Sequence, residues 1–256
     1  MVPAVRAVFR ELLRRELEER YRGSLLGVAW LLVLPLLQLA VLAWVFGQLL
    51  PARAHGGDLP YAAFLALGLW PWNLFANAAN RGVTALTDNA ALIGKVAVPH
   101  ALYVDARVAA SVVLDMAGFA AVMAALLAFG VDLSLRGLPA ALAGLAVVAI
   151  HAVAAARLLA VMQVFLRDIA TLVGQLLVLG FFLTPVLYER SLLPGQAARW
   201  LAANPLVAPV ETVRSALSGG TVGWPALGLS LLLGVGLLLL ANTLLRRARS
   251  HLEDFL

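Results

Sequence analysis

The first fifty residues change from an amphipathic pattern to a continuous apolar one. Apolar side chains recur at helical spacing from Val5 to Tyr21, and arginine and glutamate side chains fill the opposite face. This pattern is typical of a helix that lies on a membrane surface. Residues 25–50 contain no ionisable side chain, and a run of this length predicts a helix that crosses the bilayer. We therefore expect an interface helix over residues 1–24 and a first span over residues 25–50.

Five further apolar runs follow, and polar turns separate them. A spanning helix needs about 20 apolar residues, which each of these runs supplies. We expect the spans over residues 61–80, 101–129, 138–165, 169–188 and 222–245. The chain therefore has the pattern of an all-α, polytopic membrane protein with a single transmembrane domain, residues 1–256.

Residues 192–217 are apolar on average, but prolines and charged side chains interrupt them. Pro194, the pair Asn204-Pro205 and Pro209 would break a straight spanning helix. We expect two short helices here that enter the membrane and return to the same side, with protein or water covering the turn. The arginines after the last span then lie on the same side as the six that precede the first span, as the positive-inside rule requires. The prediction is six spans with both termini in the cytoplasm.

Composition supports the membrane assignment and argues against other classes of protein. Hydrophobic residues make up 62% and charged residues 13%, against roughly 45–50% and 25% in soluble domains. The net charge is +5, but the arginines gather at the edges of apolar runs, so we expect no nucleic-acid binding. With no cysteine and four scattered histidines, we expect no metal site. Phosphate-loop, H-E-x-x-H and G-x-S-x-G motifs are absent from the sequence, so we expect neither catalytic residues nor a bound cofactor.

Two charged residues lie deep within predicted spans. Asp115 comes eight residues after Arg107, and Arg157 comes ten residues before Arg167. A rise of ~1.5 Å per residue places both about 12–15 Å from the cytoplasmic boundary. An isolated charge there costs at least ~2.5–3.5 kcal/mol, so we expect Asp115 and Arg157 to form an ion pair. The alternative is a proton relay that includes His151, although arginine does not release its proton in proteins.

Five stretches spread over the chain carry a family pattern. They are RYRGSLLGVAWLLVLPLLQ (Arg20 to Gln38), GLWPWNLFANAANRG (Gly68 to Gly82), ALIGKVAVPHALYV (Ala91 to Val104), FLRDIATLVGQLLVLGFFLTPVLY (Phe165 to Tyr188) and NPLVAPVETVRSAL (Asn204 to Leu217). In this order they resemble the permease subunits of bacterial ABC-type polysaccharide exporters, which move lipid-linked O-antigens, capsules and teichoic acids. The resemblance implies a homodimer in the inner membrane, surrounded by membrane lipid, with a channel between protomers. It also implies a lipid-linked polysaccharide substrate and two copies of a separate ABC ATPase that binds ATP and Mg.

The resemblance also assigns roles to three groups of residues. Aromatic side chains would line the substrate path, because sugar C–H edges stack on rings. The candidates are Trp30, Trp44, Trp70, Trp72, Phe181, Phe182 and Tyr188. An outer gate, with basic groups able to meet a pyrophosphate-linked head group, would comprise Arg190, Arg199, Asn204, Glu211 and Arg214. The ATPase contact would comprise Arg20, Tyr21, Arg22, Asp88, Asn89 and Lys95.

Other interpretations stay open for these residues and for the chain. Each aromatic residue could instead anchor at the membrane interface or pack in the core, and the basic gate residues could bind lipid phosphates. A related ABC permease for a lipid or a drug would share the topology. A membrane-embedded enzyme of envelope-glycan synthesis would need water-facing carboxylates. A purely structural scaffold would leave the charged, broken segment 192–217 unexplained.

Overall fold

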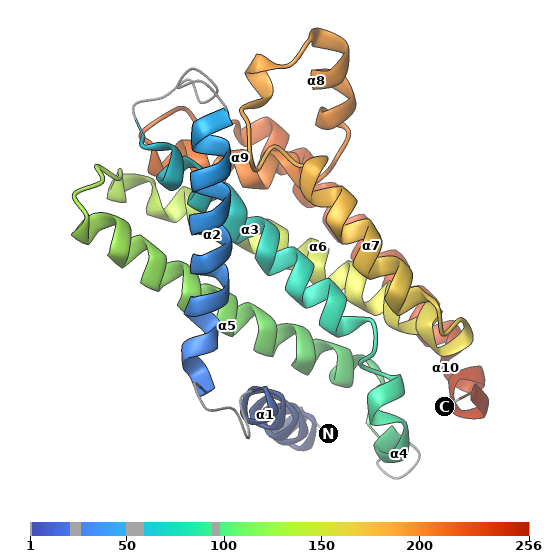
Figure 1. Ribbon diagram of the computed structural model, residues 1–256. Helices are drawn as coiled ribbons and strands as arrows, with labels where there is room; N and C mark the ends of the chain where they lie inside the picture. Colours follow the sequence, from blue (N-terminus) through green and yellow to red (C-terminus); the bar gives the residue numbers. More distant parts are fainter. Residues whose placement is uncertain (1, 21–26, 50–58, 94–97, 256) are drawn as a thin grey trace.

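The computed structural model describes residues 2–20, 27–49, 59–93 and 98–255, and this part of the chain forms helices without strands. Six helices run back and forth along the bundle in Figure 1. They are α2 (Trp30–Leu49), α3 (Tyr61–Gly82), α5 (Ala101–Ala128), α6 (Leu138–Phe165), α7 (Ile169–Phe182) and α10 (Trp224–Phe255). Both ends of the chain lie at the end of the bundle that carries α1 (Val2–Glu19) and α4 (Ala90–Ile93). The opposite end carries α8 (Gly195–Ala202).

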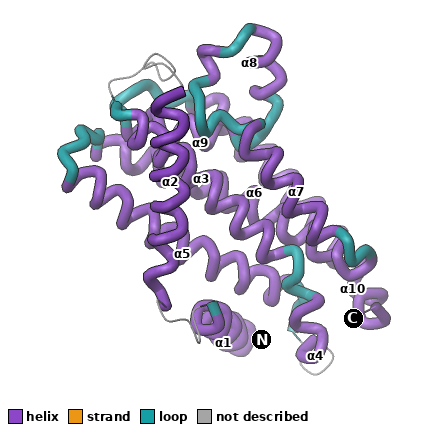
Figure 2. Tube along the Cα trace, in the orientation of Figure 1, coloured by secondary structure: helices purple, strands orange, loops and turns teal. Residues whose placement is uncertain are grey.

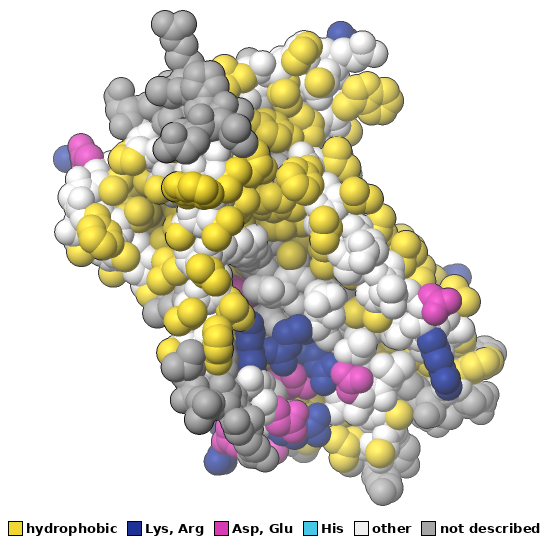
Figure 3. All heavy atoms as spheres, in the orientation of Figure 1, with side chains coloured by type: hydrophobic (Ala, Val, Ile, Leu, Met, Phe, Trp, Pro, Cys, Tyr) yellow, Lys and Arg dark blue, Asp and Glu magenta, His cyan; other side chains and the backbone are white. Residues whose placement is uncertain are grey.

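Short helices and turns connect the long helices at both ends of the bundle (Figure 2). The short helices are η1 (Gly27–Ala29), η3 (Thr87–Asn89), η4 (Leu135–Gly137), η5 (Arg190–Leu192) and α9 (Val207–Leu217). Hydrophobic side chains spread over much of the face in Figure 3, whereas basic and acidic side chains gather toward its α1 end. On this face, charged side chains therefore lie mainly at the α1 end, and the apolar remainder suits contact with a hydrocarbon core.

Helix α3 is the centre of the bundle. It packs against α2, α5, α6, α7 and α9, and 14 of its 22 residues are buried. Such extensive burial means that neighbouring helices, and not solvent or lipid, cover most of α3. Close approach to α6 depends on Gly82, because a Cβ atom there would overlap the Cβ atom of Ala156. Pro71 lies inside α3 without ending it.

In the part of the chain that the structure describes, three helical stretches are long and apolar enough to cross a membrane: α5, residues 135–165 with α6, and residues 224–249 of α10. Helix α6 begins and ends at the residues expected for the fourth apolar run, whereas α10 continues to Phe255, ten residues past the expected end. Helix α7 ends at Phe182, short of the expected residue 188. Its 14 residues rise only about 21 Å, less than the ~30 Å of a hydrocarbon core.

Irregular backbone follows α7, and protein covers it. Residues 184–187 are buried and form no regular helix. Non-helical backbone is tolerated at membrane depth only where other groups satisfy its N–H and C=O groups. The Asn204 side chain supplies one such contact, because its Nδ2 donates to Leu183 O at 3.1 Å and to Thr184 Oγ1 at 3.0 Å. The turn between α8 and α9 is thereby fixed against the end of α7.

Candidate functional site

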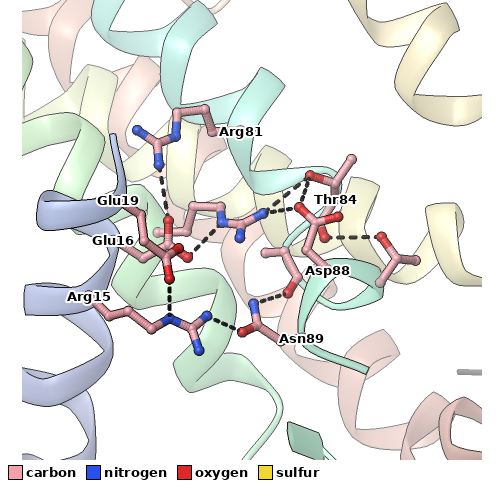
Figure 4. Close-up of polar contacts among 10 residues, drawn as sticks. Arg15, Glu16, Glu19, Arg81, Thr84, Asp88 and Asn89 are labelled. Atoms are coloured by element: carbon pink, nitrogen blue, oxygen red, sulfur yellow. Dashed lines mark hydrogen bonds and ion pairs between the residues drawn. The ribbon is translucent and has the colours of Figure 1, made fainter. Parts of the chain in front are cut away.

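Charged side chains gather where α1 packs against α3, α5 and η3, and we call this region the junction. Glu16 of α1 lies at its centre and is 3% exposed. Its Oε2 accepts a hydrogen bond from Arg81 Nη2 at 3.0 Å, and its Oε1 accepts one from Arg107 Nε at 2.9 Å (Figure 4). A buried carboxylate is tolerated only when both oxygens find partners. One side chain of α1 therefore joins α3 and α5.

The junction extends from Arg107 to η3. Arg107 Nη1 donates to Asp88 Oδ2 at 2.5 Å and to Thr84 Oγ1 at 3.2 Å. Arg15 of α1 donates to the Oδ1 atom of Asn89, beside the Glu16 contacts in Figure 4. The short helix η3 is thus held to both α1 and α5 by charge-assisted hydrogen bonds, which are stronger than neutral ones.

The residues assigned to an ATPase contact fall into three groups in the structure. Asp88 is exposed, while Asn89 is 2% exposed beneath Arg15. The Asn89 side chain is covered in this conformation, and its assignment to the ATPase contact stays a prediction. Arg20 follows α1 and lines a cavity of about 350 Å³ next to the junction. Tyr21, Arg22 and Lys95 lie outside the described residues.

The position of Glu16 in the sequence also indicates a buried role. Glu16 follows Leu12 by four residues and Phe9 by seven, so it lies on the apolar stripe of the amphipathic helix. A single carboxylate on such a stripe indicates an internal cationic partner. The partners themselves come from α3 and α5, which the sequence alone does not bring together.

A cavity of about 1110 Å³ lies at the opposite end of the bundle, bordered by η5, α8, α9 and the start of α10. We call it the gate cavity. Its charged lining residues are Asp132, Glu189, Arg190, Arg199, Glu211 and Arg214. Four of the five residues assigned to an outer gate therefore line one space. The fifth, Asn204, bonds to the end of α7 as described above.

The charges of the gate cavity are only partly paired. Arg190 Nε lies 3.3 Å from Glu211 Oε1, and both side chains are partly exposed. Burial raises the pKa of Glu211, while Arg190 and Arg214 act in the opposite direction. Arg199 Nε donates to Gly195 O at 3.3 Å within α8. Pairs of this exposure are screened by water, so they contribute little to stability and can exchange partners readily.

Arg214 has a different role from the other two arginines. Its Nε, Nη1 and Nη2 atoms donate to the carbonyl oxygens of Phe64, Pro185 and Val186 at 3.3, 2.9 and 3.0 Å. Two of these carbonyls belong to the irregular backbone after α7, so Arg214 satisfies groups that would otherwise be unpaired. Its guanidinium carbon also lies 3.8 Å from the centroid of the Phe64 ring. Burial lowers the pKa of Arg214 to about 10, which leaves it charged at neutral pH.

The aromatic residues assigned to a substrate path separate into core and surface positions. Trp70 is 2% exposed and donates from Nε1 to Asp115 O at 3.1 Å. Trp72 is also buried, against Phe75 and Phe181. Packing covers both rings in this conformation, and their assignment to a substrate path stays a prediction. Trp30, Trp44 and Phe182 are exposed on α2 and α7, and Phe181 and Tyr188 are half-buried.

The predicted ion pair between Asp115 and Arg157 is also wrong. Arg157 instead binds Asp105 with two hydrogen bonds, Nε to Oδ1 at 2.8 Å and Nη2 to Oδ2 at 2.5 Å, and donates to Asn242 Oδ1. Asp115 Oδ1 accepts a hydrogen bond from Asn77 Nδ2 at 2.9 Å. The prediction matched depths along two helices but did not consider which face each residue occupies. Asp115 faces α3, whereas Asp105 faces α6.

Comparison with known proteins identifies relatives of this chain. The family model described as ABC-2 type transporter matches residues 7–218. A protein of Myxococcus xanthus named O-antigen export system permease protein RfbA is 31% identical over 207 residues, which cover 79% of this chain and 76% of that protein. Two proteins of Klebsiella pneumoniae with the same name are 22% identical over 245 and 246 residues, 94% of this chain and 92% of each protein.

Proposed function

This chain belongs to the ABC-2 type transporter family of membrane proteins, and from this premise we propose that it is the transmembrane subunit of an ATP-driven exporter of polysaccharide. The substrate is an O-antigen-like glycan, free or linked to a lipid. The names of the relatives in two bacterial genera support this substrate class. The chain acts in transport, and the hydrolysis of ATP with Mg takes place in a separate ATPase.

The observation that carries the proposal is the gate cavity. An apolar helical bundle gains nothing in stability from a space of about 1110 Å³ lined by charges of both signs. Such a space is suited to a polar substrate that must pass an apolar barrier. The family resemblance had assigned Arg190, Arg199, Glu211 and Arg214 to one gate, and these residues come from η5, α8 and α9.

The proposal includes a location and a topology. The chain lies in the inner membrane of a bacterium, crosses it six times and has both termini in the cytoplasm. The alternating course of the long helices in Figure 1 supports this topology, as does the position of both chain ends beside α1. In this topology α8 and α9 are the two re-entrant helices, and the gate cavity opens to the outer side. Two copies of the chain would form the channel between them.

The α1 end of the bundle is the proposed contact for one ATPase subunit, so that a dimer of this chain would bind two. Support comes from the junction, where Glu16 and Arg107 hold α1 and η3 to the transmembrane helices. A partner that moves η3 would therefore also move α1 and α5. Asp88 is the exposed member of this group.

The test is ATP-dependent transport by the purified complex. The chain is co-expressed with the ATPase encoded beside it and reconstituted in liposomes with the lipid-linked glycan of the same bacterium. We expect ATP to move glycan to the protected side, and an ATPase variant without its catalytic glutamate to abolish the movement. Failure of any ATPase to copurify, together with modification of the glycan lipid by this chain alone, would replace the exporter by a membrane enzyme.

A further inference from the structure

We propose that the gate cavity binds sugar units of the exported glycan through their hydroxyl groups, and not the diphosphate of a lipid carrier. The inference rests on the proposed function, which it makes more specific. It follows from the charge balance of the cavity, from the hydrogen bonds that its arginines already make, and from its size.

The charge balance argues against a diphosphate. Among the described residues, three carboxylates line the cavity together with three guanidinium groups, so the formal charges of these six groups cancel. Sites for phosphate groups concentrate Arg and Lys, because each oxygen needs a charged donor. In this cavity the Glu211 carboxylate interacts with the guanidinium groups of both Arg190 and Arg214. A diphosphate that bound to these arginines would be repelled by the negative charge of Glu211.

The arginines are also committed to protein acceptors, although to different degrees. Arg214 uses three of its nitrogen atoms on backbone carbonyls. Arg190 uses Nε toward Glu211 at 3.3 Å, and Arg199 donates from Nε to Gly195 O. The Nη atoms of Arg190 and Arg199 are left for a ligand, and with acidic side chains on the same wall these two guanidinium groups are a weak basis for binding a diphosphate.

The remaining lining groups match the needs of sugar hydroxyls. A hydroxyl both donates and accepts, so a sugar ring is best held by donors and acceptors placed side by side. Carboxylates supply acceptors here, and the Nη atoms of Arg190 and Arg199 supply donors. The Thr212 and Ser218 hydroxyls donate to backbone carbonyls, so they offer a ligand their acceptor lone pairs. The hydroxyl side chains that line the cavity are Thr212, Ser215, Ser218 and Thr221.

The size of the cavity points the same way. Its volume is about 1110 Å³, at the upper end of the roughly 300–1,000 Å³ typical of small-molecule pockets. That space suits several linked sugar rings better than one diphosphate group. The α8 wall contributes Ala198, Arg199 and Ala202, and α8 packs mainly against η5 and α9. A chain of sugars could therefore pass with limited displacement of protein.

A cysteine-protection experiment tests the inference on the intact complex with its ATPase. The chain has no cysteine, so Ser218→Cys places a single thiol at the cavity wall. Gln196→Cys is the matched control, because Gln196 is exposed on α8 and does not line the cavity. Alkylation of each position is followed by the mass of its peptide, with either of two probes. One probe is the surface polysaccharide of the same bacterium, freed of lipid and diphosphate by mild acid, and the other is inorganic pyrophosphate.

The polysaccharide should slow alkylation of S218C about fivefold, as expected for a site that is four-fifths occupied, while pyrophosphate should not. Q196C should react at the same rate throughout. Adding Glu211→Gln should weaken the protection by polysaccharide. Protection by pyrophosphate alone, or by neither probe, would overturn the inference.

ATP hydrolysis in the same preparation separates this inference from the proposed function. If polysaccharide changes the hydrolysis rate but does not protect S218C, the exporter assignment stands and the assignment of the cavity fails. If no ATPase copurifies, the exporter assignment itself fails.

Discussion

At the α1 end of the bundle, Glu16 holds Arg81 and Arg107 within 3.0 Å, and Arg107 in turn binds Asp88. At the α8 end, charges of both signs line a cavity of about 1110 Å³, and Arg190 and Glu211 lie 3.3 Å apart with both side chains partly exposed. Both ends use arginine and carboxylate side chains. They differ in how many of the donors and acceptors are already satisfied by the protein.

This difference indicates what each end does. A closed network fixes the relative position of helices, because any displacement leaves a buried charge without a partner. An open set of charges costs little to rearrange and leaves groups for a ligand. We therefore interpret the junction as the part that positions α1 and η3, and the gate cavity as the part that meets the substrate. Arg214 is the exception at the α8 end, because it supports the backbone after α7.

Removing Glu16 should have the largest effect on stability. Glu16→Ala leaves two arginines facing each other without their carboxylate, and loss of one partner of a buried ion pair costs about 3–5 kcal/mol. The measurement is the free energy of unfolding in mixed detergent micelles. Glu18→Ala is the matched control on the same helix, because Glu18 and Arg14 form an exposed pair. Equal stability of the two variants would show that the junction is not a structural centre.

Breaking the pair between Asp105 and Arg157 should rank second. Each side chain is partly exposed, so we expect Asp105→Arg or Arg157→Asp alone to cost about 2–3 kcal/mol, less than a fully buried pair. The double exchange should recover much of that loss in the same unfolding measurement. The exchange Asp115→Arg with Arg157→Asp should give no recovery. If this second exchange recovered stability instead, Asp115 and Arg157 would be the pair, as their depths along the helices had suggested.

Gly68→Ala should have the next largest effect and should act on the α8 end. The new Cβ atom would overlap the guanidinium group of Arg214, and overpacking of this kind costs about 1–3 kcal/mol. The displaced Arg214 would also release the carbonyls of Pro185 and Val186. Melting temperature reports the loss, and Gly236→Ala is the control because no atom lies within 4 Å of its added Cβ. An unchanged melting temperature for G68A would mean that Arg214 is not held as described.

Arg190→Gln should have the smallest effect on stability and should separate stability from transport. The pair with Glu211 is partly exposed, so its loss should change the free energy of unfolding by less than about 1 kcal/mol. ATP-dependent glycan transport should nevertheless fall, because Arg190 lines the gate cavity. A loss of stability comparable to that of E16A would show that the pair of Arg190 and Glu211 holds the fold together, as the junction does.

Much of the fold was predictable from apolar runs, since α5 and α6 begin at the expected residues and the break near Asn204-Pro205 separates α8 from α9. The gate cavity was predictable in part, because prolines and charges in an apolar segment indicate a broken helix. Partners across the bundle were not predictable. Asp105 and Trp70 show why: the number of residues along a helix gives depth, but packing decides which face is buried.

The most direct test of the account is ATP hydrolysis by the chain and its ATPase in lipid bilayers, measured with and without the lipid-linked glycan. Three forms are compared: the unchanged chain, Glu211→Gln in the gate cavity and Glu18→Gln on the exposed face of α1. The account predicts that glycan changes the rate for the unchanged chain and for E18Q, and that the ratio of the rates with and without glycan is closer to one for E211Q. A glycan response that is identical in all three forms would contradict the assignment of the gate cavity to the substrate.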